Sequence, residues 1–140
     1  GHADLVIDIR HPDEEALVRL AATCAEVCRA TAAQYDCAAE VSERFAIPPR
    51  QFDGDCVALV EAAARALDLN YLKLPSGALH DAANIAALTP TAMVFVPCRD
   101  GISHNVQEYT APEDLAAGAD VLLHAMLERA GTGGRSDGQV

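Results

Sequence analysis

The first 43 residues place two short strand patterns on either side of one long helix pattern, and this order limits the folds that the chain can form. Residues 5–9 (LVIDI) are apolar and β-branched, as in a buried strand. Residues 37–43 alternate between apolar and polar side chains, as in a half-buried strand. Because two strands alone are marginally stable in water, this segment needs further strands that the chain does not supply.

A helix of about five to six turns is predicted between these strands. Pro12 and the acidic run at 13–15 favour helix initiation, because proline fits the first turn and carboxylates stabilise the positive helix N-terminus. Apolar or small side chains then recur at three- and four-residue steps on one face: Leu17, Leu20, Ala21, Cys24, Val27, Cys28 and Thr31.

Pro48-Pro49 interrupts the pattern and marks a boundary. Beyond it, residues 92–96 (AMVFV) are a buried-strand candidate, consistent with a parallel sheet. Helices are expected over about 55–67, after His80, and behind Pro112. The sequence therefore predicts an α/β fold with parts at 1–48 and 49–130, followed by a disordered tail at 131–140.

Composition excludes several kinds of partner. The chain has 21 acidic and 10 basic residues and a net charge of −11, so we expect no nucleic acid partner, which would need a basic surface. It has no apolar run of the roughly 18 residues that suggest a membrane span. The five cysteines are odd in number and lack CxxC spacing, which favours small core residues in a reducing cytoplasm over a disulfide framework.

Two polar loops interrupt the apolar elements and are the candidate sites. The first is residues 76–81 (SGALHD), and the second is residues 98–105 (CRDGISHN), followed by Glu108. The second loop directly follows the predicted strand 92–96, and ligands bind at the carboxyl ends of strands in open α/β sheets. A histidine there, His104, is a candidate metal ligand or acid–base group. From the residues alone, a surface role for His104, a helix-cap role for His80 and a solvated Arg10 stay open.

The second half of the chain resembles a known family. Residues 74–123 contain SGALHDA, PTAMVFVP and DGISHNVQE, followed by a helix with an acidic start. This order is similar to the C-terminal motifs of the zinc-dependent amidases that include N-carbamoyl-L-amino-acid hydrolases, β-ureidopropionases and allantoate amidohydrolases. The segment LVIDIRHPD resembles the part of the family's lid domain that carries a DxR motif.

This resemblance implies the C-terminal part of a di-zinc aminopeptidase-like α/β catalytic domain at 49–130. Residues 1–48 would be part of a ferredoxin-like lid and dimerisation domain. The implied reaction is cleavage of the carbamoyl or ureido C–N bond of N-carbamoyl-L-amino acids or related ureido acids. The implied cofactor of the whole enzyme is zinc, or manganese or cobalt in its place. A homodimer through the lid segment is also implied.

The resemblance also assigns roles to particular residues. His104 takes the position of a metal ligand, with Glu108 in a supporting role. Arg10 takes the position that binds the substrate carboxylate, and His80 a position that contacts substrate. Leu79 stands where the family has glycine, so its side chain is expected to crowd the substrate pocket.

The family's other metal ligands and its general-base glutamate lie N-terminal to the residues present here. Because a zinc site needs about three or four protein ligands, we expect the isolated chain to bind no zinc tightly and to be inactive. The alternative is a non-catalytic dimerisation or partner-binding module derived from the same fold. A self-contained hydrolase using Cys98 and His104 would lack a third, orienting group.

Overall fold

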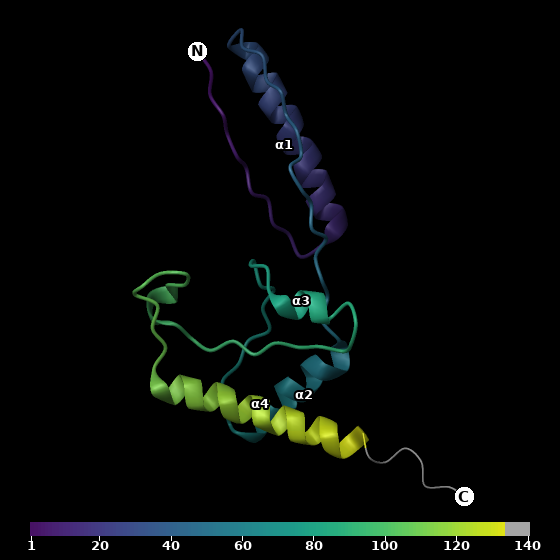
Figure 1. Ribbon diagram of the computed structural model, residues 1–140, viewed down its shortest axis with the longest axis vertical. Helices are drawn as coiled ribbons and strands as arrows, with labels where there is room; N and C mark the ends of the chain where they lie inside the picture. The colour runs from purple at the N-terminus through teal and green to yellow at the C-terminus, as the bar shows by residue number, and fades with distance from the viewer. Residues whose placement is uncertain (134–140) are drawn as a thin grey trace, which may run out of the picture. The chain divides into compact units, whose positions relative to one another are not determined.

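The computed structural model describes residues 1–133, and their regular elements are all helical (Figure 1). Two long helices are α1 (Glu14–Gln34) and α4 (Pro112–Gly133). Between them along the sequence come α2 (Gly54–Ala66), the short α3 (Asp81–Ile85) and one turn of 3-10 helix, η1 (Arg99–Gly101). None of the helices within the described residues is long and apolar enough to cross a membrane.

The start of α1 follows from its capping residue. The Asp13 carboxylate accepts a hydrogen bond of 2.7 Å from the backbone N–H of Ala16, and Glu14 and Glu15 occupy the first turn. The predicted long helix is confirmed. Its half-buried side chains recur at helical spacing and include Leu17, Ala21, Cys24 and Cys28, whereas Leu20, Val27 and Thr31 are exposed.

The three predicted strands are absent from the described residues, which corrects the sequence analysis. Residues 5–9, 37–43 and 92–96 form no β-ladder, and Figure 1 draws them as plain tubes. A β-strand is stabilised by hydrogen bonds to a neighbouring strand, and no described segment provides that neighbour. The apolar pattern is present in these segments, but it cannot form a sheet by itself.

The chain divides into two compact units. The first unit is residues 1–50 with 75–78, and the second is 51–74 with the described residues from 79 onward. The predicted division into lid and catalytic parts stays a prediction. The helix α4 continues through 131–133, where a disordered tail was expected, and 134–140 lie outside the described residues.

The core of the second unit lies between α2 and α4. Its buried side chains are small, which lets the two helices approach closely; they are Ala63, Ala64, Val121 and Ala125. Val94 and Leu69 pack against this cluster. No residue among the described residues of the first unit is buried.

Helix α4 also lies against the segment that leads into the second polar loop. A Cβ atom added at Gly118 would lie 2.3 Å from Cγ1 of Val96. A side chain at position 118 would force Val96 or the helix to shift, because normal carbon–carbon contacts are about 3.5–4.0 Å. Gly118 therefore sets how closely α4 approaches residues 92–96.

A polar cluster on α2 holds the chain that follows this helix. The Glu61 carboxylate accepts hydrogen bonds from Arg65 Nη2 at 2.6 Å and from the Tyr71 hydroxyl at 2.7 Å, and it pairs with the Lys73 ammonium. These contacts lower the pKa of Glu61 to about 2, with the hydrogen bonds from Lys73 and Tyr71 as the largest causes. The cluster fixes residues 71–73 directly before the loop that begins at Pro75.

Candidate functional site

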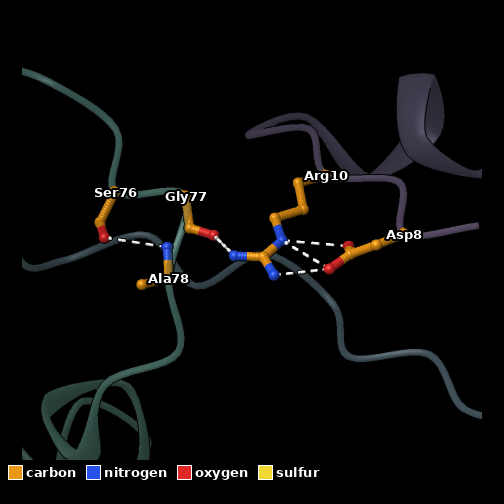
Figure 2. A network of polar contacts seen from close by, with 5 residues as sticks. All are labelled: Asp8, Arg10, Ser76, Gly77 and Ala78. Atoms are coloured by element: carbon orange, nitrogen blue, oxygen red, sulfur yellow. Dashed lines mark hydrogen bonds and ion pairs between the residues drawn. The ribbon is translucent and has the colours of Figure 1, made fainter. Parts of the chain in front are cut away.

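Arg10 is held by a carboxylate on its own segment and by a carbonyl far along the chain (Figure 2). Arg10 Nε donates to both carboxylate oxygens of Asp8, at 3.0 and 3.1 Å, and Nη2 donates to Oδ2 at 2.5 Å. Arg10 Nη1 donates to the carbonyl oxygen of Gly77, 67 residues away in sequence. The hydrogen bonding of the pair lowers the pKa of Asp8 and raises the pKa of Arg10.

The loop that supplies this carbonyl has its own local structure. The Ser76 hydroxyl accepts a hydrogen bond of 3.2 Å from the backbone N–H of Ala78, which closes a small turn around Gly77 (Figure 2). Leu79 follows immediately and is 69% exposed. The structure therefore joins two motifs that the sequence analysis treated separately, the DxR segment and the SGALHDA loop.

His80 is the residue before α3, and its side chain makes no capping hydrogen bond to that helix. His80 thus occupies the N-cap position that the helix-cap interpretation gave it, but its side chain does not cap the helix. Its ring packs edge-to-face against Phe95, with the ring centroids 5.4 Å apart and the planes at 62°. The first polar loop is thus connected, through an aromatic contact, to the segment that precedes the second loop.

The second polar loop contains a cluster of left-handed backbone conformations. Asp100, Gly101 and His104 have φ values of 58°, 67° and 57°. Residues other than glycine rarely adopt this conformation, and when they do it is held by surrounding contacts, often at functional sites. Beside Asp100, Arg99 contacts Tyr109 twice: its backbone N–H donates to the Tyr109 carbonyl at 2.8 Å, and its guanidinium lies 4.5 Å from the centre of the Tyr109 ring.

Glu108 holds the backbone of His104. Its Oε2 accepts a hydrogen bond of 2.9 Å from the His104 backbone N–H. Asn105 closes the turn between them, since its carbonyl accepts from Glu108 N at 3.0 Å and its Oδ1 accepts from Gln107 N at 2.9 Å. Glu108 therefore contacts the main chain of His104, and the role expected for it as a support of a metal ligand stays a prediction.

An open hollow of about 360 Å³ lies on the same loop, lined by Arg99, Asp100, Ile102 and Gln107. Within residues 1–133, no group of three or more His, Cys, Asp or Glu side chains could hold a metal ion. A zinc ion needs three or four protein ligands, so a metal at His104 would need ligands from elsewhere.

The sequence analysis did not predict the contact between Asp8 and Arg10. Side chains two residues apart on an extended segment point to the same side, so the spacing of the DxR motif could have indicated this pair. The hydrogen bond from Arg10 to Gly77 has no local sequence pattern that would reveal it. None of the contacts in the structure tests the roles predicted for Arg10, Leu79, His80 and His104.

Comparisons with known proteins place the chain in a family. The model of peptidase family M20/M25/M40 matches residues 3–128. An N-carbamoyl-L-amino-acid amidohydrolase of Rhizobium meliloti is 39% identical over 134 residues, which are 93% of this chain and 31% of that protein. The allantoate amidohydrolase of Escherichia coli is 33% identical over 130 residues, again with 93% of this chain covered and 32% of the relative.

A solved structure supports the same assignment. An amidase of the hydantoinase/carbamoylase family from Burkholderia multivorans matches with a TM-score of 0.84 and 43% identity, over 86% of this chain and 29% of that one. The chain spans about 31% of the length of the first curated relative. The resemblance inferred from the motifs is confirmed, and the chain belongs to peptidase family M20/M25/M40.

Proposed function

We propose that these residues are the C-terminal part of a metal-dependent amidohydrolase that cleaves the carbamoyl or ureido C–N bond of N-carbamoyl-L-amino acids or related ureido acids. One observation carries the proposal: the Arg10 guanidinium donates a hydrogen bond to Gly77 at the start of the SGALHDA loop, and both residues belong to the first compact unit. The similarity to N-carbamoyl-L-amino-acid amidohydrolases supports the same class of substrate.

Arg10 is the proposed binding group for the substrate carboxylate. A guanidinium has five N–H donors in a planar fork, which matches the two oxygens of a carboxylate. His80 would contact the substrate from the first polar loop, and the exposed side chain of Leu79 would narrow the space available to it. A narrow site would favour small substrates.

His104 is proposed as one ligand of the metal ion, zinc or in its place manganese or cobalt, that an enzyme of this kind needs to activate water. Glu108 would support it by fixing the backbone from which the imidazole projects. The other ligands and the general base have to come from polypeptide beyond these residues. We therefore propose that the chain alone has no hydrolytic activity.

A hybrid enzyme tests this function. In it, this chain replaces the matching segment of the Rhizobium meliloti N-carbamoyl-L-amino-acid amidohydrolase. We expect the hybrid to release ammonia from N-carbamoyl-L-alanine, and the 140-residue chain alone to release none. Replacing Leu79 by glycine in the hybrid should extend the range of accepted substrates if this side chain narrows the site.

The control is the hybrid with His104→Ala, which should be inactive. A folded, metal-loaded hybrid that cleaves none of N-carbamoyl-L-amino acids, 3-ureidopropionate and allantoate would contradict the proposal. That outcome would favour a non-catalytic module for dimerisation or partner binding.

A further inference from the structure

The way in which Arg10 is held leaves one part of its guanidinium available. Of its five N–H groups, Asp8 receives the one on Nε and one on Nη2, and Gly77 receives one on Nη1. One N–H on each terminal nitrogen remains. Figure 2 shows Asp8 and the Gly77 carbonyl approaching the guanidinium from different sides.

Both partners restrict the position of the guanidinium. Asp8 is only two residues away and binds side-on through both oxygens, so the pair is tethered by a short stretch of backbone. Gly77 belongs to a loop that its own Ser76–Ala78 hydrogen bond closes. A planar group held at two of its sides has little freedom to rotate, and the remaining N–H groups keep one orientation.

The pair is also accessible to a ligand. The Arg10 side chain is 60% exposed and the Asp8 side chain 62% exposed. Asp8 takes one N–H of Nη2 and the uncharged Gly77 carbonyl takes one N–H of Nη1, so one N–H on each terminal nitrogen stays open to an incoming anion. Arg10 stays protonated in this pair, so its remaining terminal N–H groups can still donate charge-assisted hydrogen bonds to a carboxylate.

We propose that Asp8 is the positioning residue for Arg10: it occupies the Nε side of the guanidinium and thereby directs the terminal Nη groups to the substrate carboxylate. This inference rests on the proposed function for the identity of the ligand. It adds a residue to which we had assigned no role, and it states which atoms of Arg10 bind the substrate.

The test is NMR of Arg10 in the full 140-residue chain, which needs no catalysis. The Nε–H and Nη–H signals are followed during titration with N-carbamoyl-L-alanine and, separately, with its amide, which lacks the carboxylate. We expect the carboxylate to shift the Nη–H signals while the Nε–H signal stays at its Asp8-bound position. The amide should shift neither.

Asp8→Asn should weaken carboxylate binding between about twofold and tenfold, because a mobile guanidinium then has to be ordered on binding. It should also move the Nε–H signal and let the ligand shift it. Asp8 is exposed, so this change should leave the fold intact. The matched control is Asp4→Asn on the same segment, since Asp4 pairs with His2 and not with Arg10.

Three results would overturn the inference: a ligand that displaces Asp8 from Nε, equal or tighter carboxylate binding by Asp8→Asn, or no shift of any Arg10 signal by the ligand. Failure of the proposed function would be visible separately, as a hybrid enzyme that does not hydrolyse N-carbamoyl-L-alanine although Arg10 binds its carboxylate in the expected way.

Discussion

At the scale of single residues, the charged and metal-binding candidates differ in what they contact. Arg10 is fixed by Asp8 and Gly77 in the first unit, whereas His104 is fixed through its backbone by Glu108 in the second. The structure thus assigns the two side chains to separate local networks. Their substitutions should therefore have different consequences in the hybrid enzyme.

We expect His104→Ala to lower metal content and kcat together, because it would remove a metal ligand. Arg10→Ala should keep the metal and raise KM for N-carbamoyl-L-alanine by about tenfold or more, because it removes the partner of a charged group. Metal analysis and steady-state kinetics of both variants, measured side by side, check this. Loss of metal in Arg10→Ala, or unchanged activity in both, would show that the roles are wrongly assigned.

Glu61 provides a prediction about acid stability. Its pKa falls to about 2 in the folded chain from an ordinary value of 4.5, because Lys73, Tyr71 and Arg65 stabilise the carboxylate. A carboxyl whose folded pKa is depressed stabilises the fold above its unfolded pKa, and this contribution is lost as the pH falls from about 4.5 to about 2. The unfolding midpoint should therefore fall across this range.

In Glu61→Gln that fall should be smaller, while stability at pH 7 should be lower than in the unchanged chain. Thermal unfolding followed by circular dichroism between pH 2 and 7 measures both effects. Glu128→Gln on α4 is the control, because Glu128 is exposed and belongs to no such cluster. An identical pH profile for Glu61→Gln and the unchanged chain would contradict the assignment.

At the scale of elements, α4 and residues 92–96 depend on one close contact. Alanine normally stabilises a helix relative to glycine by close to 1 kcal/mol. At Gly118 the change to alanine should instead destabilise the fold, because the added Cβ would lie 2.3 Å from Val96 Cγ1. The net loss on Gly118→Ala should be roughly 1–3 kcal/mol, the usual cost of overpacking.

Chemical denaturation of Gly118→Ala measures this loss. The double variant Gly118→Ala/Val96→Ala should recover part of it, because the clashing methyl group is then absent. Gly54→Ala at the start of α2 is the control, since nothing lies within 4 Å of a Cβ there. If Gly118→Ala is as stable as the unchanged chain, the helix and the segment are not packed this closely.

At the scale of the whole molecule, the first unit leaves much apolar surface in solvent. Its exposed apolar side chains include Leu5, Val6, Val18, Val27 and Phe45. Extended segments without a ladder partner also expose backbone hydrogen-bonding groups, which favours pairing with another chain. We therefore predict a homodimer of the chain through residues 4–45.

Light scattering at increasing protein concentration checks this prediction. Val18→Lys and Val27→Lys on α1 should weaken the dimer, because each places a charge on the exposed apolar surface. Leu123→Lys on α4, at a side chain that is 52% exposed, is the matched control in the other unit. A strict monomer at high concentration, or equal effects of all three changes, would contradict the predicted interface.

Local sequence patterns by themselves determined the long helices. Asp13 caps α1, Pro112 begins α4, and apolar residues at helical spacing mark α1 and α2, because a helix satisfies its backbone within one segment. The motifs around His80 and His104 likewise identified the family. The same reasoning was wrong for residues 5–9, 37–43 and 92–96, because a strand needs a neighbour that no local pattern can supply.

Only the tertiary structure decided which distant groups meet. The Arg10–Gly77 hydrogen bond joins residues 67 apart, and the His80–Phe95 ring contact and the close approach of Gly118 to Val96 also link separate segments. Composition and periodicity describe neighbours along the chain. Contacts between segments depend instead on how the whole backbone folds, so they became visible only in three dimensions.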